Sequence, residues 1–544
     1  MSVVTATILS NGAKIDPTWE VISLDVTKEV NRIPSAQIVL LDGDAARRVF
    51  AISNSNMFRP GRDIEIKLRY EGESNSDATV FKGIVVGHRV EAGAGGSILA
   101  VELKDAAIKM TRVRKSAVYP DQTDNKVIET LIANAGLKKG KLTATEPKHK
   151  ELVQYYCSDW DFMLSRAEAN GLLVVANDGQ ISVQKIAIDG AAKHAVIYGD
   201  NMLSFEIEAD AEQQYGSVES IGWSVKEQKS SKAAKAKEVS LAPGNLKGKS
   251  MASAIGFGNA KLMSLIPFID QELQAWADGF MARSRMAMIK GRVAVSGIAN
   301  VALMDIVEIK GVGERFNGKT VVTGFRHRVE GGNWQTDLQF GLSAARFAER
   351  PDIVDVPAAG LLPSIHGLQI GIVDKFQEDP DKEFRVRVNL PGIDDKGAVW
   401  ARLASPDGGN GRGFFFRPET GDEVVVGFFN DDPRHAVILG ALYGSKNAPP
   451  KALSKLTKDN FKKAIVTKKG TTIEFDDEKV TVFVQTPGKN KILLDDDKKA
   501  VTLSDQHGNT ITMDDKGITI KSAKDVKIDA SNNVEIKGAK VDVK

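Results

Sequence analysis

The chain has 544 residues, of which 42% are hydrophobic, so it can form several cores and roughly three or four domains. Its 73 basic and 71 acidic side chains nearly cancel, and a formal net charge of +2 gives no overall attraction to nucleic acid or to an anionic membrane. The single cysteine, Cys157, excludes an intrachain disulfide framework and is typical of folding in a reducing compartment. The N-terminus shows no basic segment followed by an apolar one, and no run approaches about 20 apolar residues. We therefore expect synthesis and assembly in the cytoplasm, and export only by a machine.

Short segments of alternating polar and apolar residues fill positions 1–105, separated by turn residues such as Pro60 and Gly61. This pattern predicts a first β-barrel. Between 106 and 200 the period becomes helical, as in the segment that begins at the expected N-cap residue Ser158. A small α/β insert is therefore expected there.

Residues 201–345 return to short strands around one long helix, expected from about Asp270 to Lys290, and predict a second β-barrel. The helix carries an apolar stripe that we interpret as core, formed by Leu273, Trp276, Ala277, Phe280 and Met281. A stretch rich in Lys, Ala and Ser within 226–250 is typical of a solvated loop or linker, and its composition leaves open whether it is a disordered surface loop or makes contacts with the N-terminal domains.

A Pro-rich linker at 346–363 precedes five short strands at 364–444, which predict a five-stranded barrel of the OB type. We call this part the collar. It contains three consecutive phenylalanines, and alternation places Phe414 and Phe416 on one face and Phe415 on the other. Core or subunit contacts are expected for these rings rather than stacking on single-stranded nucleic acid, because the charge of the chain is balanced.

After a second linker at 445–463, residues 464–544 repeat one unit: a turn glycine, an alternating apolar strand and an acidic turn. Beyond Gly517 the unit settles into an eight-residue register. Its first column holds Ile518, Val526 and Val534, and its second column holds Ile520, Ile528 and Ile536. A fixed short period indicates stacked, similar strands.

Each of these strands buries only one face, and a single chain would leave that face and the strand edges uncovered. Three chains around one axis remove both faults, so the six column residues are the expected core of a trimeric β-helix needle. Burying one Val or Ile contributes roughly 1.5–3 kcal/mol. The repeat leaves a monomeric β-meander with charged turns open as the alternative.

Several long segments carry a resemblance: GLQIGIVDKFQEDPDKEFRVRVNLPGID, then VWARLASPDGGNGRGFFFRPETGDEVVVGFFNDDPRHAVILGALYG, then the repeat tail. Together they resemble one family, the spike proteins of contractile injection systems. The N-terminal segments LVQYYCSDWDFMLSRAEANGLLVV and RFNGKTVVTGFRHRVEGGNWQTDLQFGLS are similar to the hub of the same family. The family includes the VgrG proteins of type VI secretion, the spikes of extracellular phage-tail-like particles, and the hub and needle of contractile phage tails.

The resemblance implies a mainly β fold with two tube-like hub barrels, an α/β insert, an OB-fold collar and a C-terminal triple-stranded β-helix formed by a trimer. It implies a homotrimer that caps the inner tube, adapts threefold to sixfold symmetry and pierces the target envelope when the sheath contracts. Inner-tube and baseplate proteins are the expected partners of the hub, and contact with the target membrane is expected to be transient.

A PAAR-type tip protein is the expected partner at the C-terminal end, with Val541, Val543 and Lys544 nearest the contact. Assembly is expected in the bacterial cytoplasm, followed by export as part of the particle or secretion machine. The resemblance does not distinguish a type VI system from an extracellular particle or a phage, and it identifies neither the target cell nor the cargo.

No catalytic, cofactor or metal site is expected. Gly313 to Thr320 matches the phosphate-binding pattern GxxxxGK[ST], but a β-branched strand follows where a phosphate-binding helix is required, so we expect a hairpin turn. The seven histidines are dispersed without metal-ligand spacing.

The acidic pairs of the tail are interpreted as solvated corners rather than glycosidase carboxylates or calcium ligands. These pairs are Asp476-Asp477, Asp495-Asp496 and Asp514-Asp515. The alternative function left open is a tailspike-type polysaccharide or cell-wall hydrolase that uses these carboxylates.

Overall fold

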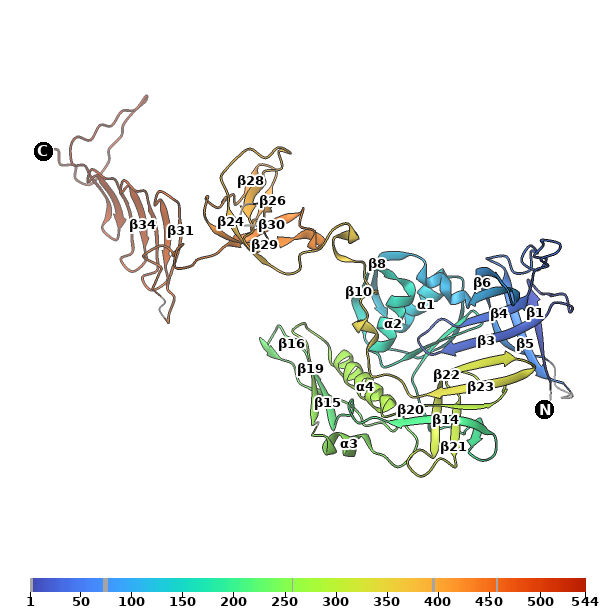
Figure 1. Ribbon diagram of the computed structural model, residues 1–544. Helices are drawn as coiled ribbons and strands as arrows, with labels where there is room; N and C mark the ends of the chain where they lie inside the picture. Colours follow the sequence, from blue (N-terminus) through green and yellow to red (C-terminus); the bar gives the residue numbers. More distant parts are fainter. Residues whose placement is uncertain (1–2, 72–76, 257, 394–396, 456–457) are drawn as a thin grey trace. The chain divides into compact units, whose positions relative to one another are not determined.

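The computed structural model describes residues 3–71, 77–256, 258–393, 397–455 and 458–544. The chain is mainly β and forms two compact units, Met1–Asp355 and Val356–Lys544 (Figure 1). We call the first unit the hub. None of the helices in the described ranges combines the length with the apolar composition needed to cross a lipid bilayer.

One continuous sheet forms the frame of the hub. Its strands in the described residues are β1 Val4–Ser10, β2 Ala13–Lys14, β3 Val21–Glu29, β4 Ser35–Leu41, β5 Asp63–Tyr70, β6 Ala78–Gly93, β7 Gly96–Lys104, β13 His194–Ile197, β14 Met202–Ala209, β20 Ile289–Ser296, β21 Ile306–Lys310, β22 Gly318–Glu330 and β23 Asn333–Phe340. Their order is β14-β20-β23-β22-β3-β4-β7-β6-β5-β1-β2, and β21 also pairs with β22 and β13.

The sheet has two halves that meet where β3 pairs with β22, from Ser23 opposite Glu330 to Glu29 opposite Gly324. Strands β1 to β7 surround one core, which includes Phe58 and Leu103. Strands β14 and β20 to β23 surround another core, which includes Leu338. The two expected β units are therefore present, but they share a single hydrogen-bonded ladder (Figure 1).

The α/β insert forms as expected between the two halves. Its elements are η1 Ala106–Thr111, β8 Arg114–Thr123, α1 Asp124–Asn134, β9 Lys138–Leu142, β10 Lys148–Ser158, α2 Asp159–Ala169, β11 Leu173–Asn177 and β12 Gln180–Gln184. Ser158 caps α2, because its hydroxyl oxygen accepts the N–H of Asp161 at 3.1 Å. The structure differs at one boundary: β13 lies inside the range expected for the insert, yet it pairs with β21 and places Val196 in the core of the second half.

A small lobe with one long helix lies between β14 and β20. Its elements are β15 Ser217–Ile221, β16 Trp223–Ser224, β17 Lys229–Ser230, β18 Ala234–Lys235, α3 Gly248–Ala254, β19 Asn259–Met263 and α4 Asp270–Ala287. Leu273, Ala277 and Met281 of α4 are buried as expected. Phe280 packs against this core, as expected, and also lines a cavity, whereas Trp276 lines the cavity and is only partly buried.

The Lys-rich stretch was expected to be either a solvated loop or a contact with the N-terminal domains, and residues 234–238 make such a contact. Strand β18 pairs with β15, and the N–H of Lys237 donates to Asp278 Oδ1 of α4 at 2.7 Å. Glu238 binds the guanidinium of Arg285, which is only 2% exposed. Composition indicated solvation, but a buried arginine requires a carboxylate partner, and this segment supplies it.

The segment that matches the phosphate-binding pattern forms a hairpin turn, as expected. The N–H groups of Phe316 and Asn317 both donate to the carbonyl of Gly313, at 3.1 and 2.9 Å. Strand β22 then begins at Gly318, where a phosphate site would need a helix.

In the second unit, five strands of the described residues close into the expected collar barrel in the order β24-β25-β26-β30-β29. The collar strands are β24 Gln369–Val373, β25 Val386–Asn389, β26 Ala398–Leu403, β27 Gly408–Gly409, β28 Arg412–Gly413, β29 Glu423–Phe428 and β30 Ala436–Ala441. Short 3-10 turns in the first linker are η2 Phe347–Glu349 and η3 Pro357–Gly360, and the collar contains η4 Phe429–Asp431. The second linker includes residues 456–457, which lie outside the described residues.

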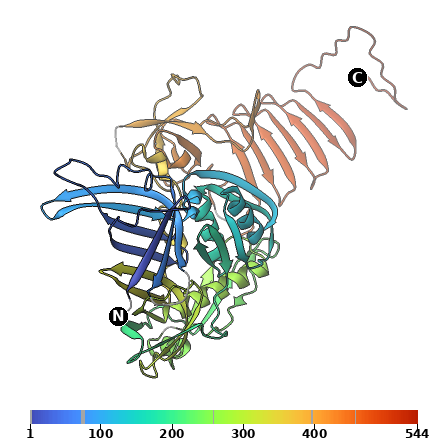
Figure 2. The same cartoon turned by 90° about the vertical axis from the view of Figure 1, so that its right-hand side faces the viewer.

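The needle begins as an antiparallel meander in which each strand pairs with the next one along the chain (Figure 2). Its strands are β31 Lys462–Val466, β32 Thr472–Asp476, β33 Thr481–Gln485, β34 Lys491–Asp495, β35 Ala500–Ser504, β36 Thr510–Asp514 and β37 Gly517–Lys521. Residues 522–544 continue without a strand of their own in this chain.

Candidate functional site

The meander of the needle gathers apolar side chains in two columns on one face. Cross-strand partners such as Ile492 and Leu503, or Leu494 and Val501, are both apolar. The first column holds Ile465, Ile473, Val484, Ile492, Leu503, Ile511 and Ile520. The second holds Phe475, Val482, Leu494, Val501, Met513 and Ile518. Residues two apart on a strand share a face, so both columns lie on the same side of the sheet.

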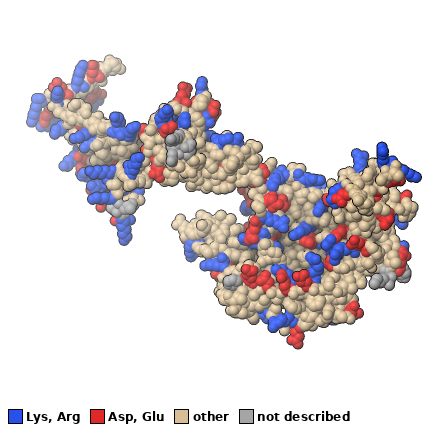
Figure 3. Space-filling model, viewed as in Figure 1, with Lys and Arg blue, Asp and Glu red and all other residues tan. Residues whose placement is uncertain are grey.

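The opposite face is of a different composition. The positions between the two columns are Ala464, Glu474, Phe483, Leu493, Thr502, Thr512 and Thr519. The last three strands therefore present only threonine there. The sheet therefore has one apolar and one largely polar side. Figure 3 shows both basic and acidic side chains on the visible face of the needle.

The apolar face is only partly covered in the single chain, where five of its column residues are half-buried and the other eight are exposed. Ile492 and Leu494 are each 43% exposed, and the exposed fraction rises to 71% and 64% for Ile518 and Ile520. A sheet with one uncovered apolar face is unstable and prone to association. This face, which we call the needle face, is the candidate site.

The structure places only two of the six column residues expected from the eight-residue register on the needle face, Ile518 and Ile520 in β37. The other four lie beyond the last strand, and each is 53–69% exposed: Val526, Ile528, Val534 and Ile536. The expected tip residues Val541 and Val543 are also exposed, at 53% and 92%, and Lys544 is exposed at the end of the chain. These assignments stay predictions.

Sequence reasoning missed the column residues of β31 to β36, although the same alternation marks them. Their strands begin nine or ten residues apart, as at Thr472, Thr481 and Lys491, so no fixed register aligns them in the sequence. Cross-strand pairing aligns them in space, because turns of unequal length still return the chain to the same face.

The acidic turns fix the meander rather than merely solvating it. Asp476 and Asp495 are buried, and they accept N–H groups of the turn: Lys479 donates to Asp476 at 3.2 Å, and Lys498 donates to Asp495 at 2.9 Å. The interpretation as solvated corners is therefore wrong for these two residues, whereas their neighbour Asp477 is exposed.

The pKa values of Asp476 and Asp495 are both lowered, as expected for carboxylates that accept hydrogen bonds from the turns. Burial by itself would raise the pKa of Asp476, but the N–H of Lys479 and the ammonium of Lys462 outweigh it and hold that pKa below its ordinary value. The N–H of Lys498 lowers the pKa of Asp495 in the same way. Both carboxylates are thus ionised turn caps.

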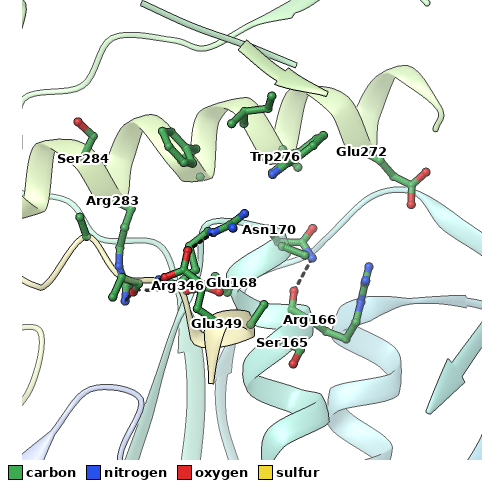
Figure 4. A pocket seen from close by; sticks show the side chains of 18 of the residues that line it. Ser165, Arg166, Glu168, Asn170, Glu272, Trp276, Arg283, Ser284, Arg346 and Glu349 are labelled. Atoms are coloured by element: carbon green, nitrogen blue, oxygen red, sulfur yellow. Dashed lines mark hydrogen bonds and ion pairs between the residues drawn. The ribbon is translucent and has the colours of Figure 1, made fainter. Parts of the chain in front are cut away.

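A second candidate is a cavity of about 850 Å³ in the hub, between α2 and α4 (Figure 4). At one end Asp124 accepts two hydrogen bonds from Arg166, at 2.6 and 3.0 Å, one from Asn170 at 2.8 Å, and lies 3.2 Å from His149 Nε2. Burial favours protonation of Asp124, but Arg166 outweighs it and lowers the pKa of this carboxyl.

The other end of the cavity lies against residues 343–347, the segment that follows strand β23. Arg283 of α4 donates to the carbonyls of Ser343 and Ala345, both at 2.7 Å. Glu168 of α2 accepts the N–H of Phe347 at 2.9 and 3.0 Å. Burial lowers the pKa of Arg283.

The charged groups of the cavity that we have described bind one another or the main chain of 343–347. These contacts hold the segment 343–347 against α2 and α4, so the cavity has a structural role. Within the described residues, no group of three or more His, Cys, Asp and Glu side chains is placed to hold a metal ion.

Comparison with protein families gives three matches. The model of the Alg8 N-terminal domain matches residues 1–331, which is more than half of the chain. The model of the type VI secretion system and phage-baseplate injector OB domain matches residues 369–443. The model of the phage baseplate V C-terminal trimerisation domain matches residues 479–544, and thus contains most of the needle face.

Curated relatives match over shorter stretches. The type VI secretion system spike protein VgrG3 of Vibrio cholerae is 32% identical over 99 residues, 17% of this chain and 10% of that protein. The spike protein VgrG5 of Pseudomonas aeruginosa is 39% identical over 75 residues, 13% of this chain and 10% of that protein. The actin cross-linking toxin VgrG1 of Vibrio cholerae is 32% identical over 78 residues, 13% of this chain and 7% of that protein. The match thus spans a tenth or less of these relatives.

Similar solved structures include a tail protein of Neisseria meningitidis, with 14% identity and a TM-score of 0.46 over 65% of this chain and 99% of that one. An Escherichia coli component of the type VI secretion system has 13% identity and a TM-score of 0.38 over 80% of this chain and 99% of that one. A chain of the Francisella PdpA–VgrG complex has 9% identity and a TM-score of 0.41 over 96% of this chain and 88% of that one.

Proposed function

The chain belongs to the Alg8 N-terminal domain family and is a VgrG-like spike protein, and on this premise we propose that three copies form the central spike of a contractile injection machine. The observation that carries the proposal is the needle face. It is apolar along its length and partly solvent-exposed in the single chain, and the trimerisation domain contains most of it. Three copies around one axis would bury these faces against one another.

The energetics favour such an assembly. Each Ile, Leu or Val that becomes buried contributes roughly 1.5–3 kcal/mol relative to exposure, and the columns repeat this gain along every strand. Part of the gain is offset by the loss of freedom on association. A trimer held by its needle is therefore expected to persist at low protein concentration.

The hub supports a role in symmetry adaptation. Each chain contributes two sheet halves with separate cores, so three chains would present six β units. We propose that this ring caps the sixfold inner tube and contacts baseplate proteins. The shared ladder between β3 and β22 would hold the two halves of each copy at a fixed spacing.

The C-terminal end of the chain would form the tip of the spike. The C-terminal end, with Val541, Val543 and Lys544, would seat a PAAR-type tip protein. Sheath contraction would drive the spike through the target envelope, so the chain would work mechanically and not as an enzyme. Assembly in the bacterial cytoplasm and export as part of the machine follow from this role, and they are supported by the relatives that are type VI spike proteins.

Light scattering tests the proposal directly. The full-length chain should have the mass of a trimer. A version without residues 464–544 lacks the needle face, so its trimer should weaken or dissociate, and its mass should fall toward that of one truncated chain. A full-length chain that is monomeric at micromolar concentration would contradict the proposal.

A further inference from the structure

The hub cavity between α2 and α4 has an aromatic wall in addition to its ion pairs. Four rings form this wall: Phe268 before α4, Trp276 and Phe280 one turn apart on α4, and Tyr215 after β14. Figure 4 shows Trp276 on the side of α4 that faces Asn170 at the end of α2. The hydrogen bonds that hold the exit from β23 against the two helices involve none of the four rings. The wall is therefore free to serve another purpose.

The four rings are held by contacts with one another and remain partly accessible. The Phe268 and Trp276 rings have centres 5.9 Å apart and planes inclined by 43°. The Tyr215 and Phe280 rings have centres 5.5 Å apart and planes inclined by 49°. All four residues are half-buried, so each ring offers part of its surface to the cavity. The electron-rich face of an aromatic ring attracts cations.

Carboxylates outnumber basic groups at the end of the cavity where Trp276 lies. Glu272 is one turn before Trp276 on α4, so the two side chains share a face of the helix. Oε1 of Glu272 lies 3.5 Å from Nδ1 of His149, and Nε2 of the same imidazole lies 3.2 Å from Asp124. Asp124 in turn forms an ion pair with Arg166. The charge of Glu272 has no arginine or lysine partner among these groups.

Glu146 adds a further negative charge at this end. It lines the cavity three positions before His149, and it is exposed. Within the part of the chain that the structure describes, Glu146 forms no hydrogen bond or ion pair. Three carboxylates therefore lie with one arginine and one histidine, and their sum is negative whether or not the histidine is protonated.

The basic side chains at the other end of the cavity have carboxylate partners of their own. Arg283 lies about two turns beyond Trp276 on α4, or roughly 10 Å along the helix axis. The pairs are Arg283 with Glu168 at 3.7 Å, Arg346 with Glu349 at 2.9 Å and Lys290 with Glu208 at 3.0 Å. These charges balance locally, so the negative charge at the Trp276 end persists.

An aromatic face beside uncompensated carboxylates has the chemistry that recognises an organic cation. We propose that the Trp276 end of the cavity binds a guanidinium group, which lies over the indole ring and donates to Glu272 and Glu146. A guanidinium fits better than an ammonium, because its plane stacks on a ring while the N–H groups at its edge reach carboxylates. The whole cavity, at about 850 Å³, has the size of an ordinary ligand pocket.

The guanidinium belongs either to a free small molecule or to an arginine side chain of a partner segment, and the chemistry of recognition is the same for both. The inference does not rest on the proposed function, because every residue of the site lies in the hub. It assigns to the hub a binding role that is separate from the assembly of the spike.

Isothermal titration calorimetry of the full-length chain tests the site. The probe is butylguanidinium, and butylurea is its matched control, because it has a similar planar head without the charge. The expected result is saturable binding of butylguanidinium with a dissociation constant in the millimolar range or below, and no binding of butylurea. The short peptide acetyl-Gly-Arg-Gly amide is titrated in parallel to distinguish the two sources of the group.

Variants locate the binding at the proposed residues. Trp276→Ala should weaken the binding of butylguanidinium roughly tenfold, because the cation loses the ring beneath it. Glu146→Gln should weaken it roughly threefold, a smaller effect because this carboxylate is exposed. The matched control is Trp223→Ala, which removes a half-buried tryptophan of β16 outside the cavity and should leave the dissociation constant unchanged.

The outcomes decide the inference even if Trp276→Ala proves unstable, because Glu146→Gln alters only an exposed side chain. Absence of saturable binding at millimolar butylguanidinium would overturn it. Equal binding of butylurea would also overturn it, since the site would then select shape and not charge. Tighter binding of the peptide than of butylguanidinium would support the inference and assign the group to an arginine of a partner segment. Weaker binding of the peptide would support it with a free small molecule as the ligand.

Discussion

The hub and the needle use the same kind of residue in opposite ways. In the hub, β-branched and aromatic side chains on both halves of the sheet are enclosed by the chain itself, so that Ile38 and Leu338 are fully buried. In the needle, the same alternation leaves 43% of Ile492 and 64% of Ile520 exposed. The difference is that the hub encloses its core within one chain, whereas the needle leaves much of its apolar face uncovered in the single chain. Variants that separate folding from association therefore test this comparison.

The largest effect is expected on the needle face. Leu503→Asp with Ile520→Asp places two carboxylates per chain in the proposed interface, where each buried unpaired charge costs several kcal/mol. We expect the trimer to dissociate, as measured by light scattering, while the unfolding transition of the hub is unchanged.

The neighbouring threonines provide the matched control for this pair. Thr502→Asp with Thr519→Asp changes the adjacent positions of the same strands, on the opposite face. This variant should remain trimeric. Equal dissociation by both pairs would show that the needle face is not the interface.

A substitution in the hub core should have the opposite effect: it should destabilise folding and leave association unchanged. Phe340 is 1% exposed in the core of the second half, and Phe340→Ala should destabilise the hub by about 3–5 kcal/mol through the cavity that it leaves. Calorimetry should show a lower transition temperature, and light scattering should still show the trimer. Phe205→Ala, at a position that is 41% exposed on the edge strand β14, is the control and should change little.

A further variant concerns the end of the needle, beyond β37. Ile528→Asp with Ile536→Asp alters residues that form no ladder in the single chain. If these residues join the trimer core as predicted, the variant loses roughly 1.5–3 kcal/mol of burial per side chain in addition to the charge penalty, and the dissociation constant rises. An unchanged dissociation constant would restrict the interface to β31 to β37.

A pH-dependent effect is expected at the hub cavity. Asp124→Asn removes the ion pair with Arg166 and should lower the stability of the hub by roughly 1.5–3 kcal/mol near neutral pH. Because the folded-state pKa of Asp124 is depressed, its contribution is present above the ordinary value of 3.8 and is lost as the pH falls through the lower folded value.

The difference between Asp124→Asn and the wild type should therefore shrink as the pH is lowered below 3.8 in denaturant titrations. Asp121→Asn is the control: Asp121 lies 3.5 Å from Lys150 on the surface, and such pairs contribute little. A stability difference for Asp124→Asn that does not vary with pH would exclude the ion pair as its cause.

The smallest effect is expected at the turns of the needle. Asp495→Ala removes the carboxylate that accepts the N–H of Lys498, so the amide of Lys498 should exchange with deuterium faster while the trimer persists. Asp496→Ala, at the exposed neighbouring position, should leave that exchange rate unchanged.

Local patterns explain which elements were predictable. The capped start of α2 at Ser158, the hairpin at Gly313 and the closed collar barrel all follow from turn residues and periodicity over short stretches. The ion pair between the buried Arg285 and Glu238 was not predictable, because the two residues are 47 positions apart and their pairing depends on how the lobe packs on α4. The same holds for Asp124 and Arg166, which are 42 positions apart.

The order of the parts, the one-sided alternation of the needle and the resemblance to injection-system spikes can be read from the residues alone, because they depend on local residue order. The single ladder that β3 and β22 form between the hub halves, and the turn that Asp476 caps, become visible only in the folded chain. The folded chain also shows that the columns of β31 to β36 align on one face and that the phenylalanines of the collar point outward. These features depend on cross-strand register and on contacts between distant segments, and a single strand carries no information about which neighbour it will meet.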